Sequence, residues 1–214
     1  MTENIPITIS TYHEYLLEAI LSLGEGLRRK GLESEIFSRY SFLMIANSLE
    51  AAANALLLDL NVESDYYEEL EKLNTLMKFK TFCYFNKKKL NVGDVRFARI
   101  RDIISCRNEF VHPKPKQVDF NFDLKTNEII FASSKTKNRN YPLYFSEIKS
   151  KHALTALEDT LSFVSWVCFD ICKLKIDDGS LMLGLGSRSR TSDLTYLGEK
   201  YKIKFDQRTF GEIR

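Results

Sequence analysis

The chain of 214 residues contains little glycine, proline, cysteine or histidine: 9, 4, 4 and 3 residues respectively. Together with the length of the chain, so few glycines and prolines suit one compact domain, or one domain with an appendage. The four cysteines form no C-x-x-C pair, and the three histidines do not have the ligand spacing of known zinc sites. We therefore expect reduced, mostly buried thiols, no metal ion and no cofactor.

The sequence also lacks an excess of charge of one sign. Lysine and arginine number 31 and aspartate and glutamate 29, which gives a net charge of +2. This balance excludes a uniformly basic nucleic-acid-binding protein, although it allows a local basic site. No apolar run approaches the roughly 20 residues that cross a bilayer. The first ten residues, MTENIPITIS, do not resemble a signal peptide, so we expect a cytoplasmic protein without membrane contact.

Hydrophobic residues are abundant, at 44% with 15 Phe and 10 Tyr, and they recur at helical spacing. Thr11 and Glu14 have the spacing of a capping box at the start of the first helix. The second helix is apolar on most sides, as is typical of a central helix. Residues 80–93 are interpreted as a connection. The five helices that we predict span residues 11–30, 34–60, 64–79, 94–111 and 151–174.

The hydrophobic period changes after Pro113, which ends the fourth predicted helix. Alternating residues predict a strand over 118–124, a partner strand over 129–132 and a third short strand over 141–145. The predicted fold class is therefore all-α, a bundle of about five helices with a small β-hairpin insertion at about 117–146. We expect residues 1–178 to form one domain, followed by a loop and tail at 179–214.

The fourth predicted helix carries an arginine in its apolar stripe. At 100° per residue, Arg107 falls within the arc of Ile100, Ile104 and Val111. An unpaired buried charge costs several kcal/mol, so this arginine requires a partner. His112 follows at the end of the helix, about 140° around the axis and about 7.5 Å along it.

A polar stripe on the second predicted helix offers such a partner. Asn47, Glu50 and Asn54 follow i, i+3, i+7 spacing on a helix that is otherwise largely apolar. We expect Glu50 to be the carboxylate that pairs with Arg107. The alternative to a functional role is a purely structural one, in which Arg107 is paired with Glu50 and His112 caps the last helical turn.

The segment RNEFVHP, residues 107–113, resembles the R-x4-6-H motif of the HEPN superfamily, and ANSLEAAANALL in the second helix is similar to the corresponding HEPN helix. The resemblance implies a helical, usually dimeric domain with metal-independent endoribonuclease activity. Arg107 and His112 would be the catalytic pair, with Asn108 auxiliary. Such domains are found in toxin–antitoxin, abortive-infection and antiviral defence systems, so an antitoxin or another defence protein is an expected partner.

The chemistry of these residue types suits RNA cleavage. The 2′-OH of RNA attacks the adjacent phosphate, so the nucleophile is already in place. Histidine transfers protons near neutral pH, and a guanidinium stabilises charge that develops on phosphate oxygens. Because one helix separates Arg107 and His112, we expect a two-fold homodimer to bring two such pairs into one cleft.

Two basic segments are candidate RNA contacts. The first interleaves lysines with aromatic residues in KFKTFCYFNKKK, and the second is the polar loop SSKTKNRN. Their basic residues are Lys87, Lys88, Lys89, Lys135, Lys137 and Arg139. The alternative is that these side chains are merely solvated. Likewise, the alternative function is a catalytically inactive HEPN-like interaction module that binds a protein, a nucleotide or RNA.

Overall fold

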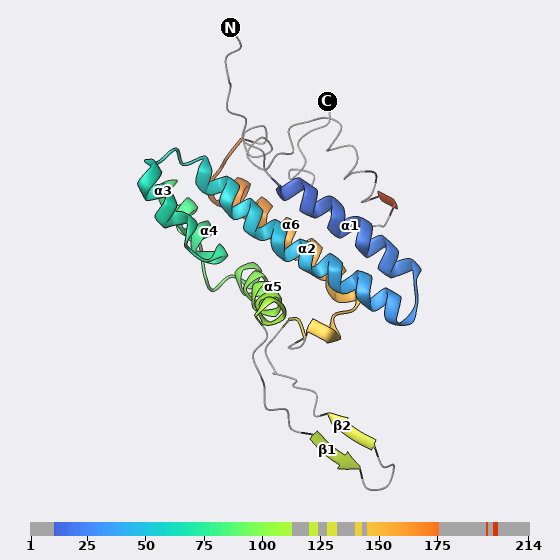
Figure 1. Ribbon diagram of the computed structural model, residues 1–214. Coiled ribbons are helices and arrows are strands. Elements are labelled where there is room, and N and C mark those ends of the chain that lie inside the picture. Colours follow the sequence, from blue (N-terminus) through green and yellow to red (C-terminus); the bar gives the residue numbers. More distant parts are fainter. Residues whose placement is uncertain are drawn as a thin grey trace.

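A computed structural model of the 214-residue chain describes residues 11–112, 120–123, 128–131, 140–142, 145–175, 196 and 199–200. The described part is mostly helical, which confirms the all-α class (Figure 1). Its α-helices are α1 (Tyr12–Arg28), α2 (Gly31–Leu58), α3 (Ser64–Glu71), α4 (Thr75–Phe85), α5 (Val95–Val111) and α6 (Ser150–Ser165). A 3-10 helix, Phe145–Glu147, precedes α6, and a π-helical segment, Trp166–Ile171, extends it.

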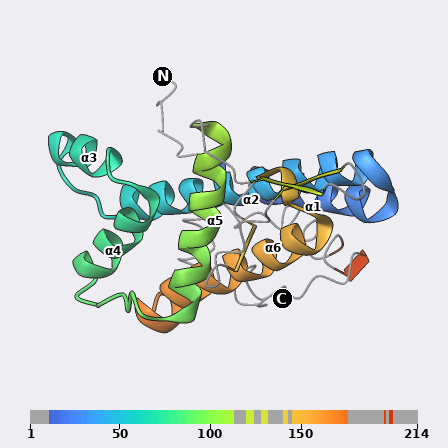
Figure 2. The ribbon, with the colours of Figure 1, turned by 90° about the horizontal axis from the view of Figure 1, so that it is seen from below.

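Helix α2 is the centre of the bundle, as its all-round apolar composition predicts. It packs against α1, α4 and α6, and α5 crosses it (Figure 2). The connection from α1 consists of Arg29 and Lys30, and Gly31 begins α2 with φ +62°, a left-handed conformation that glycine adopts without steric cost. This short turn makes α1 and α2 antiparallel neighbours.

By length and composition alone, α2 is also long and apolar enough to cross a membrane. However, 67% of its most apolar 18-residue window is buried inside the protein. Leu49, Ala53 and Leu56 are completely buried on this helix. A core helix of a folded domain has the same features, because it too is surrounded by apolar side chains.

The third predicted helix is wrong in its extent, because the structure divides it into α3 and α4. Asn74 stands at the break, and its side-chain Oδ1 accepts a hydrogen bond from the backbone N–H of Met77 at 3.0 Å. An asparagine in this position caps a new helix, which then continues to Phe85. The segment expected to connect two helices at residues 80–93 is therefore helical over its first six residues.

Thr11 stands at the N-cap of α1, but its side chain makes no capping hydrogen bond, so the predicted capping box is not formed. A comparable arrangement starts α6 instead. There the backbone N–H of Lys149 donates to Nδ1 of His152 at 3.1 Å. This bond satisfies one of the backbone donors that helix geometry leaves without a partner within the helix.

Between α5 and α6 the chain contains strands β1 (Phe120–Asp123) and β2 (Glu128–Phe131), which pair antiparallel with Phe122 opposite Ile129. Figure 1 shows the two strands outside the helical bundle (Figure 1). The strand predicted for residues 141–145 is wrong for its described residues. Tyr141 and Pro142 lie in irregular backbone, and Phe145 begins the 3-10 helix.

Candidate functional site

The last turn of α5 presents the three residues of the proposed catalytic group. Nη1 of Arg107 donates a hydrogen bond to Oδ1 of Asn108 at 3.1 Å. Helix α5 ends at Val111, and the C-cap residue His112 leaves helical geometry with φ −125° and ψ 65°. Its backbone N–H still donates to the carbonyl of Asn108 at 2.9 Å. The Asn108 and His112 side chains are exposed, and Arg107 is half-buried.

The burial that we expected for Arg107 is not complete, because α5 emerges from the core before its end. Phe97, Ile100, Ile103 and Cys106 are the buried residues of this helix. Past Cys106, the apolar Phe110 and Val111 are exposed by 49% and 42%. The guanidinium of Arg107 therefore reaches solvent, and among the described residues no carboxylate lies within ion-pair distance of it.

The predicted pairing of Glu50 with Arg107 is wrong. Oε1 of Glu50 instead accepts from Nζ of Lys78 at 2.5 Å, and its Oε2 accepts from the Thr75 hydroxyl. Asn54 also accepts from Lys78 Nζ, at 2.7 Å. The Lys78 side chain is buried, so the polar stripe of α2 stabilises a buried cation of α4 and not the arginine of α5. Asn47 is half-buried on the same face of α2.

Beside the last turn of α5 lies an open groove of about 390 Å³. The groove is lined by Ile36, Arg39, Tyr40, Leu43, Phe110, Phe145 and Ser146. The rings of Phe110 and Phe145 stack with centroids 4.1 Å apart, which attaches the end of α5 to the 3-10 helix. Most of these side chains are apolar and several are exposed, so the catalytic candidates lie next to an exposed apolar surface.

Arg39 is a residue that sequence reasoning missed. Its Nε donates to the backbone carbonyl of Glu35 at 3.2 Å, and its side chain lines the groove together with Phe110. It adds a second cation near the end of α5. The signal in the sequence that could have drawn attention to Arg39 is the apolar stripe next to it on α2. Leu32, Ile36 and Tyr40 recur every four residues there, and they are exposed by 67%, 52% and 45%.

A polar network around the buried side chains of Asp159 and Tyr141 fixes the middle of α5 to the bundle. Oδ1 of Asp159 accepts from Arg99 Nη1, and its Oδ2 accepts from the Tyr141 hydroxyl, both at 2.7 Å. Burial raises the pKa of Tyr141, and the Asp159 charge raises it further. Asp102 accepts from the backbone N–H and the side-chain Nδ2 of Asn140 at 3.1 and 3.0 Å. The chain thus leaves α5 at its end and returns to the middle of the same helix.

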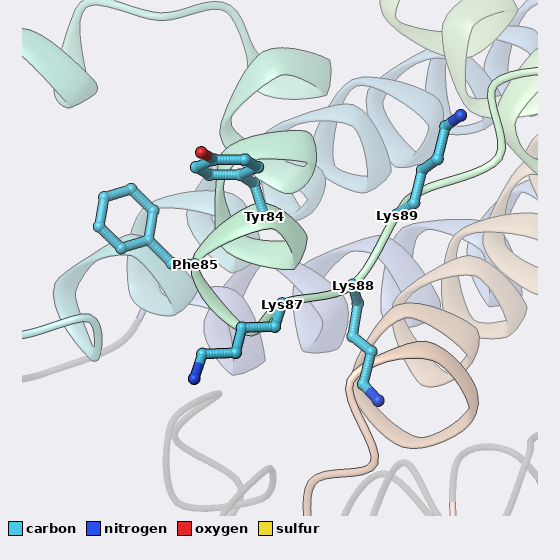
Figure 3. A pocket seen from close by; sticks show the side chains of 5 residues that line it. All are labelled: Tyr84, Phe85, Lys87, Lys88 and Lys89. Atoms are coloured by element: carbon cyan, nitrogen blue, oxygen red, sulfur yellow. The ribbon is translucent and has the colours of Figure 1, made fainter.

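The lysines at 87–89 are exposed, but they do not lie beside Arg107 and His112 of the same chain. They follow α4 and precede α5, whereas the proposed catalytic group ends α5. Twelve residues of α5, 95–106, precede Arg107 in the helix, which corresponds to about 18 Å of helix axis. Figure 3 shows the three lysine side chains pointing in different directions (Figure 3).

Aromatic side chains accompany these lysines. Tyr84 is 77% exposed and Phe85 39%, and both line an open depression together with Lys87, Lys88 and Lys89. The rings of Tyr84 and Phe85 have an edge-to-face arrangement with centroids 6.2 Å apart. Such a surface can stack bases and attract phosphates. The other candidate contacts, Lys135, Lys137 and Arg139, lie outside the described residues.

Within the described ranges, no three histidine, cysteine or acidic side chains are grouped so that they could hold a metal ion. Comparison of the chain with models of protein families, with curated proteins and with solved structures yields no match. The arrangement at the end of α5 must therefore be judged from its own chemistry: an exposed imidazole, an adjacent amide, and a guanidinium that lacks an ion-pair partner among the described residues.

Proposed function

We propose that the protein is a metal-independent endoribonuclease of the HEPN type. The observation that carries this proposal is the last turn of α5, where Arg107 reaches solvent without a carboxylate partner among the described residues and His112 is exposed five residues later. Arg107 holds the scissile phosphate, and His112 transfers a proton during attack by the 2′-OH. Asn108 orients the guanidinium through the hydrogen bond at 3.1 Å.

We further propose that the active form is a homodimer. The exposed apolar side chains of Leu32, Ile36 and Tyr40 continue into the groove at Phe110, so a second copy that covers this surface would lie beside Arg107. A two-fold axis there brings two arginines and two histidines together. Each site then combines Arg107 of one chain with His112 of the other. Covering the stripe also removes several large apolar side chains from water.

The RNA strand has a second contact in this proposal. Lys87, Lys88 and Lys89 attract the backbone, and the exposed ring of Tyr84 stacks a base. The lysine and arginine positions at 135, 137 and 139 are proposed to add positive charge. A cytoplasmic effector of a prokaryotic toxin–antitoxin, abortive-infection or antiviral system is the role that we propose. The burial of most of α2 supports a protein that is not held in a membrane.

The test is incubation of the purified protein with total RNA in the presence of EDTA. We expect cleavage products with 2′,3′-cyclic phosphate ends, and we expect Arg107→Ala and His112→Ala to reduce the rate by a factor of 100 or more, on the order expected for acid–base and electrostatic groups. Arg101→Ala, which removes an exposed arginine from the same helix, is the matched control and should retain wild-type activity.

The second candidate is a catalytically inactive interaction module. The exposed apolar stripe on α2 favours it, because a binding surface for another protein has the same composition. Absence of cleavage with every RNA tested, together with equal effects of wild-type protein and His112→Ala in cells, would select this module and reject the ribonuclease.

A further inference from the structure

Two cysteines that are 89 residues apart in the sequence meet at the edge of the core. The Sγ atoms of Cys83, near the end of α4, and Cys172, just after the π-helical segment, lie 3.8 Å apart at hydrogen-bond distance. Cys83 is completely buried and Cys172 is 8% exposed. Cys168 lies four residues before Cys172 and is also buried. Neither sulfur belongs to the proposed catalytic group at the far end of α5.

The backbone fixes both cysteines in this position. Cys83 lies before a turn in which Lys87 is left-handed, with φ 57°, and its carbonyl accepts from the Lys88 N–H at 2.9 Å. Cys172 ends the π-helical segment through its N–H bond to Val167 O at 3.0 Å, and Lys173 follows with φ 59°. Two hydrogen-bonded helix ends thus hold the thiols against each other, and their proximity does not depend on one loop.

The two thiols are not equivalent. The pKa of Cys172 is lowered, first by its hydrogen bond with the Cys83 thiol and then by the positive charge of Lys88, against the opposing effect of burial. The pKa of Cys83 is raised, first by its hydrogen bond to Cys172 and then by burial. Cys172 is also the more exposed of the two, so it is the sulfur that ionises and meets a small reagent first.

From this geometry we infer that Cys172 and Cys83 form a thiol-oxidation site, which a hydroperoxide converts into an intramolecular disulfide. The Cys172 thiolate attacks the terminal oxygen of the hydroperoxide and the O–O bond breaks. The alkoxide or hydroxide leaves and takes up the proton that Cys172 released, and Cys172 becomes a sulfenic acid. The Cys83 sulfur then attacks Sγ of Cys172, the S–O bond breaks, and water leaves with the proton of Cys83. With hydrogen peroxide, two thiols lose two electrons and the peroxide becomes two waters.

The new bond requires the sulfurs to approach from 3.8 Å to the disulfide length of about 2.05 Å. Rotation of the two side chains and small shifts of the two helix ends can bring them together. The disulfide joins the end of α4 to the end of the π-helical segment. The closed loop contains α5, and so the segment that carries Arg107 and His112. In a cytosolic protein such a disulfide is transient and reversible.

The experiment treats the full-length protein with hydrogen peroxide, blocks the remaining thiols under denaturing conditions and counts them by mass spectrometry. We expect two of the four thiols to be lost without dimer formation and to return with dithiothreitol. Peptide fragmentation should locate the bond between Cys83 and Cys172. Cys106→Ala, which removes a buried thiol of α5, is the matched control and should still lose two thiols.

Cys83→Ala and Cys172→Ala should each abolish the intramolecular disulfide, with folding checked by circular dichroism. The inference is overturned if the wild-type protein keeps four free thiols at peroxide concentrations that oxidise a free thiol peptide. It is equally overturned if fragmentation locates the bond between Cys168 and Cys172, or if Cys83→Ala forms an intramolecular disulfide at the wild-type rate. The wild-type fragmentation decides the matter even if one variant fails to fold.

Discussion

The buried Nζ of Lys78 on α4 lies 2.5 Å from Oε1 of Glu50 on α2. This ion pair joins two helices that are separated by a turn and by α3. The Glu50 side chain is 36% exposed and the Lys78 side chain 4%, so the lysine depends on the pair more than the glutamate does. Removal of the carboxylate would leave a buried ammonium with only Asn54 as a side-chain acceptor among the described residues.

Glu50→Ala should therefore destabilise the fold by about 2–4 kcal/mol, slightly less than for a fully buried pair because water reaches the carboxylate. Lys78→Met in the Glu50→Ala background should recover most of the loss, because it removes the unpaired charge. Urea denaturation of both single variants and the double variant gives the coupling energy. Equal losses in Glu50→Ala and in the double variant would contradict the pair.

The buried carboxylate of Asp159 has two partners, and we expect different costs for their removal. Arg99→Ala should destabilise the fold by about 2 kcal/mol, because it leaves the Asp159 carboxylate, whose side chain is only 9% exposed, without its cation. Tyr141→Phe should cost about 1 kcal/mol, because it removes one neutral donor and Arg99 still pairs with the carboxylate. Thermal or urea unfolding of the two variants tests this order, and a Tyr141→Phe loss larger than that of Arg99→Ala would contradict it.

His152 should make stability depend on pH. Its pKa is lowered, first because burial disfavours the imidazolium and second because Lys151 repels it. The unfolded chain therefore binds the proton more readily, and the free energy of unfolding falls as the pH decreases from the unfolded value near 6.5 through the lower folded value. Protonation of Nδ1 also removes the acceptor for the Lys149 N–H.

The matched variant for this test is His152→Gln, because glutamine at this helical position can accept the same bond without titrating. Urea unfolding at pH 7.5 and pH 5.5 should show a smaller loss on acidification for His152→Gln than for the wild type. Identical losses in the two proteins would assign the acid sensitivity to other groups.

The proposed dimer predicts a specific effect of charge on the α2 stripe. Ile36→Asp places a carboxylate on the exposed apolar surface beside Phe110, so it should convert the dimer to a monomer and reduce RNA cleavage at least tenfold. Val92→Asp alters a side chain of nearly equal exposure before α5 and should change neither property. Light scattering at micromolar concentration gives the mass. A wild-type protein that is monomeric and fully active would refute the composite site.

Mixed dimers test whether one cleft uses residues of both chains. Arg107→Ala and His112→Ala subunits, each inactive alone, should regain about one quarter of the wild-type activity when co-expressed, if random pairing yields one intact composite site per mixed dimer. The measurement is RNA cleavage by the purified mixture, with each single variant as its control. Co-assembled subunits that remain inactive would contradict a site divided between the two chains.

The sequence by itself determined the helical class and most helix ends, because these depend on short-range features. Apolar periodicity located α1, α2, α5 and α6, and Pro113 marked the end of α5 to within two residues. It also located the arginine, asparagine and histidine on one helix end. It failed at Asn74, where a single capping side chain outweighed a continuous helical pattern and divided one helix into two.

Only the tertiary structure decided which side chains meet. Helical spacing predicted that Arg107 needed a carboxylate and that Glu50 would supply it, but the packing of α4 on α2 placed Lys78 against Glu50 instead. The depth of Arg107 depended on where α5 leaves the core, which periodicity along one helix does not specify. Cys83 and Cys172 likewise meet only because α4 and the π-helical segment that follows α6 are neighbours. Spacing determines the face of a helix, whereas the contact of two faces depends on how distant segments exclude water together.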